Sequence, residues 1–142
     1  MKAKILAIIV SIIGLIDAVY LIVIKVVKKE SLCFIRASDC LSVNNSAYSE
    51  IYGFPIAALG AIAFLTILVL LIFELKSIFI GRIFPFAFFG LTLIGVIYSA
   101  YLTYLEIAVI NAVCPFCVIS AVCMLALFIL SLFHFKNPPL DY

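Results

Sequence analysis

Four long apolar segments constrain the fold of this chain more than any other feature. They span Ile5–Ile24, Phe54–Phe73, Ile83–Leu105 and about Pro115–Phe133. About 20 residues of α-helix, at a rise of 1.5 Å per residue, cross a hydrocarbon core of about 30 Å. None of the segments shows the alternating polarity of the short strands in a membrane barrel. The sequence therefore predicts an all-α, integral membrane four-helix bundle, with residues 1–142 forming a single domain.

The composition supports a membrane protein. Hydrophobic residues make up 68% of the chain and charged residues 11%, whereas a soluble domain has about 45–50% and about 25%. So few charges would not cover the surface of a small soluble globule. The net charge of +2 indicates no particular partner, so we expect contact with lipid and no nucleic-acid partner. The first apolar segment is longer than the 7–15 residues of a signal sequence and lacks a small-residue cleavage site, which indicates a retained span.

Four of the five cysteines form two pairs that this topology brings to one face of the membrane. Cys33 and Cys40 lie in the polar segment between the first two spans, and Cys114 and Cys117 open the last span. The basic residues are divided almost evenly between the two faces, so the positive-inside rule does not decide the orientation. Because disulfides persist in oxidising compartments, we expect the cysteine face to be the extracytoplasmic side of a multi-pass cell-membrane protein.

The spacing within the two pairs favours thiol–disulfide exchange. The Cys114-Pro-Phe-Cys117 run begins a predicted helix, where unpaired N–H groups and the helix dipole favour the reactive thiolate. A loop dithiol such as Cys33 and Cys40 can exchange with it through a mixed disulfide. Two alternatives remain open: a non-enzymatic four-span scaffold with two structural disulfides, and a four-cysteine zinc or copper site. Six residues separate Cys33 from Cys40, which is wide for structural zinc, so we expect no metal.

Four further residues have a predicted place. Asp17 is an acid inside the first span, so it is either functional or paired with a tyrosine hydroxyl or Lys25. Glu106 is expected to be a solvated residue at the membrane interface. His134 lies in the last turn of the fourth span, where a cationic side chain suits the helix dipole. Cys123 is expected to be a small packing residue without a chemical role.

A weak internal repeat relates the first and third spans. The segment Gly14–Leu21 aligns with Gly95–Leu102 at an offset of 81 residues, and the same offset aligns Cys33 with Cys114. Each odd-numbered span would then deliver a cysteine to the same face at the same depth. Shared membrane composition explains the matches equally well, and both readings stay open.

In combination, four motifs resemble the vitamin K epoxide reductase family, and in particular its bacterial and archaeal members. The resemblance extends from about Gly14 to Phe133. Its motifs are Cys33 with Asp39-Cys40-Leu-Ser-Val-Asn-Asn-Ser46, Gly53-Phe-Pro-Ile-Ala-Ala-Leu-Gly60, Tyr101-Leu-Thr-Tyr-Leu105 and Cys114-Pro-Phe-Cys117.

The resemblance implies an enzyme that reoxidises a thioredoxin-fold partner and passes the electrons to a membrane quinone of the ubiquinone or menaquinone type, supporting disulfide formation. Cys117 would lie nearest the quinone, Cys114 would exchange with Cys40, and Cys33 would accept electrons from the partner. Ser46 matches a family serine that helps to hold the quinone or the loop.

The sequence departs from the vertebrate members of this family at two places. Vertebrate members bind vitamin K partly through an asparagine in the loop helix, and no clear equivalent precedes Gly53 here. They also hold vitamin K through a tyrosine four residues after the last motif cysteine, where this chain has Ala121. The departures favour plain quinone reduction over reduction of the epoxide. Several bacterial relatives carry a fused thioredoxin-like domain. None follows the fourth span here, so the partner is expected to be a separate protein.

Overall fold

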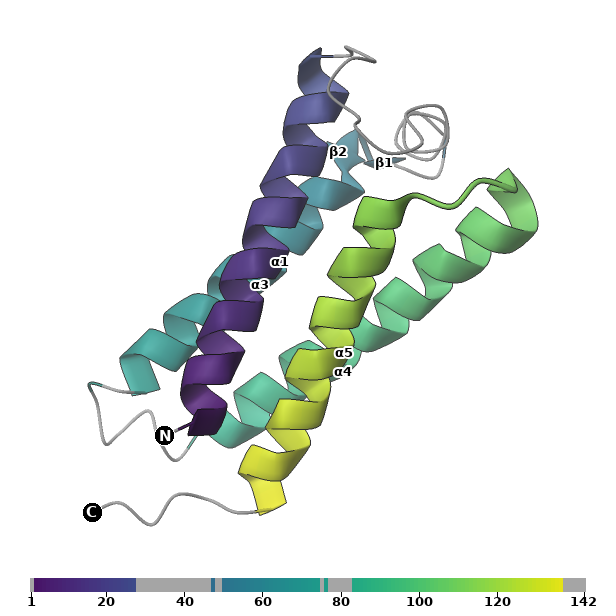
Figure 1. Cartoon of the computed structure of the whole chain (residues 1–142). Helices are drawn as coiled ribbons and strands as arrows, with labels where there is room; N and C mark the ends of the chain where they lie inside the picture. The colour runs from purple at the N-terminus through teal and green to yellow at the C-terminus, as the bar shows by residue number, and fades with distance from the viewer. Residues whose placement is uncertain (1, 28–46, 48–49, 75, 77–82, 137–142) are drawn as a thin grey trace.

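The computed structural model describes residues 2–27, 47, 50–74, 76 and 83–136 of the chain. The all-α prediction is confirmed: four long helices account for most of these residues (Figure 1). The elements in chain order are α1 (Lys2–Val27), β1 (Glu50–Ile51), β2 (Phe54–Pro55), α3 (Ile56–Glu74), α4 (Phe84–Leu105), the π-helical turn η4 (Glu106–Ile110) and α5 (Pro115–Lys136).

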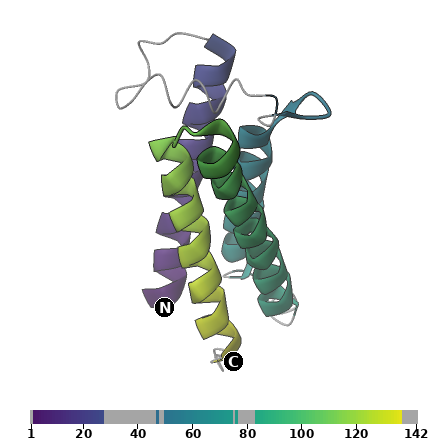
Figure 2. The same cartoon turned by 90° about the vertical axis from the view of Figure 1, so that its right-hand side faces the viewer.

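The four helices run alternately up and down, so the end of α1, the start of α3, the end of α4 and the start of α5 share one end of the bundle (Figures 1 and 2). Each helix is long and apolar enough to cross a bilayer. The chain is therefore a multi-pass membrane protein. We refer to the end that holds Cys114 and Cys117 as the cysteine end.

The predicted boundaries need two corrections at the cysteine end. The second span was expected to start at Phe54, but Phe54 and Pro55 form a short strand and the helix starts at Ile56. The strand pairs with Glu50–Ile51 through a tight turn at Tyr52 and Gly53, both at positive φ, as hairpin turns require. The third span was expected to end at Leu105, but it continues through η4 to Ile110.

Helix α1 packs closely against its neighbours because one of its faces carries small side chains. Ala7, Ser11, Gly14 and Ala18 recur every three or four residues and are all buried, which places them on one side of the helix. Small residues allow membrane helices to approach closely. At Gly14 the approach is closest, since a Cβ added there would overlap the ring of Phe64 from α3.

Helices α4 and α5 also approach each other closely at a glycine. A Cβ added at Gly95 would lie 2.6 Å from the Sδ atom of Met124 on α5. Gly14 and Gly95 are the first residues of the two aligned segments of the internal repeat, and each accommodates a large side chain from a neighbouring helix. The two glycines therefore have the same packing role in α1 and α4.

A cluster of charged residues joins three helices at the end away from the cysteines. The Glu74 carboxylate at the end of α3 lies 3.2 Å from Lys4 Nζ and 3.1 Å from His134 Nε2. His134 was expected to interact favourably with the helix dipole of α5, and the structure adds Glu74 as an acidic partner. Removing one partner of a buried ion pair leaves the other charge without compensation and strongly destabilises a protein. This cluster therefore holds the ends of α1, α3 and α5 together.

The close approach at Gly14 predicts the effect of a single methyl group. Gly14→Ala should destabilise the bundle by about 1–3 kcal/mol, because the Phe64 ring has to move out of a packed position. Gly90→Ala is the matched control, since a Cβ at Gly90 meets no atom within 4 Å. Unfolding of the purified protein in mixed micelles measures both changes. Equal stability of the two variants would contradict the packing described here.

Candidate functional site

The chain reverses direction sharply between α4 and α5. After the wider π-helical turn, Asn111 adopts the left-handed conformation with φ 54°, which ends the helix. The amide of Ala112 donates a 3.1 Å hydrogen bond to the carbonyl oxygen of Glu106. Pro115 then starts α5, at a position where its missing N–H costs nothing. The reversal places the two motif cysteines beside the end of α4.

Cys114 and Cys117 lie one helical turn apart against α1. Cys114 is 1% exposed and packs with Leu21 and Ile24 of that helix. Cys117 is half-buried, and the two thiols lie within hydrogen-bonding reach of each other. The spacing predicted from the sequence thus does bring the two sulfurs together, as formation of an intramolecular disulfide requires.

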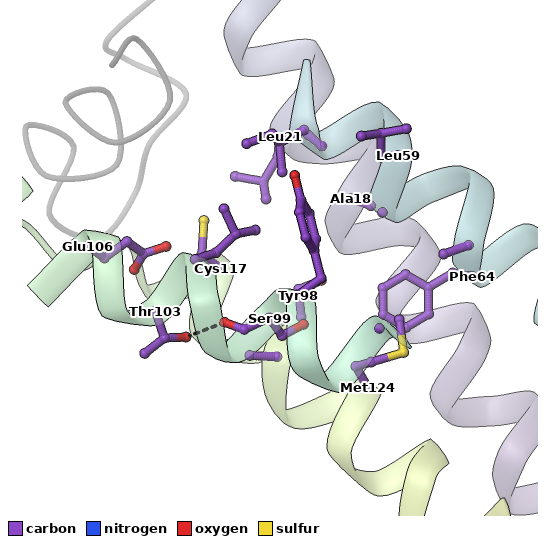
Figure 3. Close-up of a pocket in the computed structure, with 18 of the residues that line it drawn as sticks. Ala18, Leu21, Leu59, Phe64, Tyr98, Ser99, Thr103, Glu106, Cys117 and Met124 are labelled. Atoms are coloured by element: carbon purple, nitrogen blue, oxygen red, sulfur yellow. Dashed lines mark hydrogen bonds between the residues drawn. The ribbon is translucent and has the colours of Figure 1, made fainter. Parts of the chain in front are cut away.

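A cavity of about 310 Å³ lies beside Cys117 and is lined by residues of α1, α3, α4, η4 and α5. Figure 3 shows Cys117 and Glu106 at one end of it and Phe64 and Met124 at the other. Much of the wall is aliphatic, and it includes Ala121. An apolar cavity with a few polar groups at one end is the usual form of a small-molecule site.

The polar groups of the cavity come mainly from one face of α4 and its continuation. Tyr98, Ser99, Thr103 and Glu106 all line it. The Thr103 hydroxyl donates to the Ser99 carbonyl at 2.9 Å, whereas the buried hydroxyl of Tyr98 has no hydrogen-bond partner among the described residues. Sequence reasoning missed this face. The signal was the spacing of Ser99, Thr103 and Glu106, which are i, i+4 and i+7 in a largely apolar helix.

Glu106 corrects an expectation. It was expected to be solvated at the membrane interface, but it is only 4% exposed. Its Oε2 atom accepts a 3.4 Å hydrogen bond from the Cys114 amide, and its carboxyl lies within hydrogen-bonding reach of the Cys117 thiol. The reason is that the helix continues past Leu105, so that Glu106 follows Ser99 and Thr103 on the face that lines the cavity. The apolar segment ends at Leu105, and its length therefore suggested an exposed position for the next residue.

Asp17 is also buried, at 8% exposure, on the side of α1 that faces α5. Its carboxyl interacts electrostatically with Cys114 and Cys123, and its Oδ2 atom has no hydrogen-bond partner within the described ranges. Lys25, one of its expected partners, forms a 3.0 Å ion pair with Glu50.

The other predicted site residues, Cys33, Cys40 and Ser46, lie outside the described residues. Whether the loop pair meets the helix pair therefore stays a prediction. Cys123 is buried in the hydrophobic core cluster that includes Phe64, Ile67 and Leu127, as its expected packing role requires. In the described part of the chain, no group of three or more His, Cys, Asp or Glu side chains could hold a metal ion.

Taken together, these features define a membrane helix bundle with a dithiol beside an apolar cavity. The sequence matches the vitamin K epoxide reductase family over residues 5–132, which is most of its length. The chain belongs to this family. No curated protein matches the sequence. Membership supports a membrane thiol oxidoreductase in general terms, and the family as a whole uses quinone-type substrates.

The different environments of the two thiols predict different reactivity. In a protein with Cys33, Cys40 and Cys123 changed to serine, N-ethylmaleimide should modify Cys117 at least about tenfold faster than Cys114, because only Cys117 lines the cavity. Mass spectrometry of the reduced protein, stopped at early times, measures both rates. Modification of Cys114 at an equal rate would mean that the buried thiol is reached by another route.

Proposed function

We propose that this protein oxidises a separate thioredoxin-fold protein and transfers the electrons to a membrane quinone, which supports disulfide formation. The observation that carries the proposal is the position of Cys117, which lies within reach of Cys114 and lines an apolar cavity. A dithiol at this place can give two electrons to a molecule in the cavity and become a disulfide.

A quinone suits the cavity in size and polarity. Its ring is flat and mostly apolar, and the cavity has aliphatic walls with Phe64 and Tyr98 as its aromatic residues. Its two carbonyl oxygens need hydrogen-bond donors, and the hydroxyl of Tyr98 is free to donate one within the described part of the structure. Burial of such a hydroxyl without a partner is unfavourable, which supports a ligand that accepts its hydrogen bond.

The wall of the cavity also favours a quinone over the vitamin K epoxide. At Ala121, the position of the vitamin K-binding tyrosine in vertebrate members, a methyl group lines the cavity. Tyr98 approaches the same cavity from α4 instead (Figure 3). We infer that the Tyr98 hydroxyl meets a ligand from α4, on a different side of the cavity from the vertebrate tyrosine position on α5.

The loop cysteines complete the proposed electron path. The reduced partner would transfer its electrons to the disulfide of Cys33 and Cys40, and Cys40 would exchange with Cys114 through a mixed disulfide. Cys114 is buried against α1, so its exchange requires a close approach of the loop, to which Ser46 would contribute. We place this face on the extracytoplasmic side of the cell membrane, where partner disulfides persist.

Changing the cysteine that faces the cavity tests the proposal. Cys117→Ala should abolish reduction of a soluble ubiquinone analogue by purified protein supplied with a reduced thioredoxin-fold donor, because the remaining thiol cannot form the disulfide. The absorbance change of the quinone measures the rate. Cys123→Ala, which removes a buried thiol of the core cluster, should keep the rate within about twofold. Full activity of Cys117→Ala would refute the mechanism.

Tyr98 provides a separate test of how the quinone is held. Tyr98→Phe should raise the KM for the quinone analogue by about tenfold, since one hydrogen bond to a carbonyl oxygen is lost. The reaction at saturating quinone should change much less. Tyr101→Phe is the matched control, because Tyr101 is largely exposed on the same helix and does not line the cavity. An unchanged KM in the Tyr98 variant would exclude this contact.

A further inference from the structure

The buried carboxyl of Glu106 lines the cavity beside Cys117, and the proposed electron path does not use it. Hiding a carboxyl from water is costly unless its oxygens are satisfied. None of the ion pairs formed among the described residues includes Glu106. Its polar neighbours are instead the amide of Cys114 and the thiol of Cys117. A carboxyl kept in such a place is a candidate for chemistry at those thiols.

The position of Glu106 connects the thiol to the cavity. Glu106 and Cys117 both line the cavity, and in Figure 3 the carboxyl of Glu106 points toward the side on which Cys117 lies. The carboxyl can therefore reach the thiol proton and a ligand oxygen without a large movement. A group that exchanges protons in a reaction must lie within hydrogen-bonding reach of both positions.

From this arrangement we propose that Glu106 is a catalytic proton carrier between the Cys117 thiol and the quinone. The inference rests on the proposed function. In the net reaction the Cys114 and Cys117 thiols form one S–S bond, and two S–H bonds break. Two electrons pass to the quinone, which becomes a quinol. Glu106 takes the Cys117 proton as the sulfur loses electrons, delivers it to one quinone oxygen and ends unchanged. The Cys114 proton is released to water, and the second quinone oxygen takes one from water.

A purely structural role is the competing explanation. The Glu106 carboxylate accepts the hydrogen bond of the Cys114 amide just before α5 begins, and an acceptor at a helix start stabilises the helix. Glutamine can accept the same hydrogen bond but cannot carry the proton. Glu106→Gln therefore separates the two roles.

Quinone reduction by the pre-reduced protein is the first measurement. Glu106→Gln should lower the rate constant of a single turnover by at least about tenfold, within the range of general acid–base catalysis, while its thermal unfolding stays close to that of the unmodified protein. The pH dependence of this rate constant should show one ionisation step fewer than in the unmodified protein. The titratable groups facing Glu106 are Cys114, just before α5, and Cys117, in its first turn. Asp17 on α1 interacts electrostatically with Cys114.

Two controls separate the proton role from loss of charge or packing. Glu50→Gln removes an acid from the same end of the bundle, outside the cavity lining, and should keep the rate within about twofold. Glu106→Ala should be slow and should recover at least threefold with added formate, a small carboxylic acid that can enter the vacated space. A structural acceptor would give no such rescue. A normal rate and an unchanged pH profile in Glu106→Gln would overturn the proposal.

One measurement keeps this inference distinct from the proposed function and needs no quinone. The alkylation rate of Cys117 against pH should change in Glu106→Gln, because the neighbouring proton acceptor is gone. If the unmodified protein reduces no quinone but this change is seen, the proposed function fails and the proton contact stands. If Glu106→Gln fails to fold, infrared difference spectra of the unmodified protein during turnover decide. A carboxyl band that forms and decays during turnover, and that is also seen in the Asp17→Asn variant, supports the proposal. The absence of such a band overturns it.

Discussion

The reversal between α4 and α5 sets the position of the two motif thiols and of the Glu106 carboxyl. Buried backbone amides need hydrogen-bond partners, and Ala112 and Cys114 are both buried at this reversal. Here Ala112 bonds to the Glu106 carbonyl, and Cys114 bonds to the Glu106 carboxylate. The residue that closes one span therefore also supports the start of the next. Because the dithiol begins at that start, the carboxyl and the two thiols come together.

The cavity depends on an uneven packing of the four helices. Helix α1 lies closely against α3 and α5, with small residues on its buried face, and α4 lies closely against α5. Helices α3 and α4 meet much less, and residues of both line the cavity. Phe64 and Met124, the side chains seated against Gly14 and Gly95, close the end away from the thiols. Close contacts in one part of the bundle thus leave space in another.

Much of the fold could be predicted from hydropathy alone, because a bilayer allows few arrangements for long apolar segments. The spans agree with the helices except near the cysteine end, where a hairpin takes Phe54 and Pro55 and a π-helical turn extends the third span. Hydropathy measures apolarity and does not register such local backbone changes. The expectation for Glu106 was wrong because the third span was taken to end at Leu105, whereas the helix continues and keeps Glu106 on the face of Ser99 and Thr103.

The sequence by itself determined the membrane class and the number of spans, because these follow from the length and apolarity of the segments. That the two cysteine pairs share one face stays a prediction. The sequence also determined that Cys114 and Cys117 would meet, because they are one helical turn apart. Only the tertiary structure decided that Cys117 lines a cavity, that Tyr98 enters it and that Glu106 is buried beside the thiols. These facts depend on how helices rotate and pack against one another, and contacts between residues distant in the chain set that rotation.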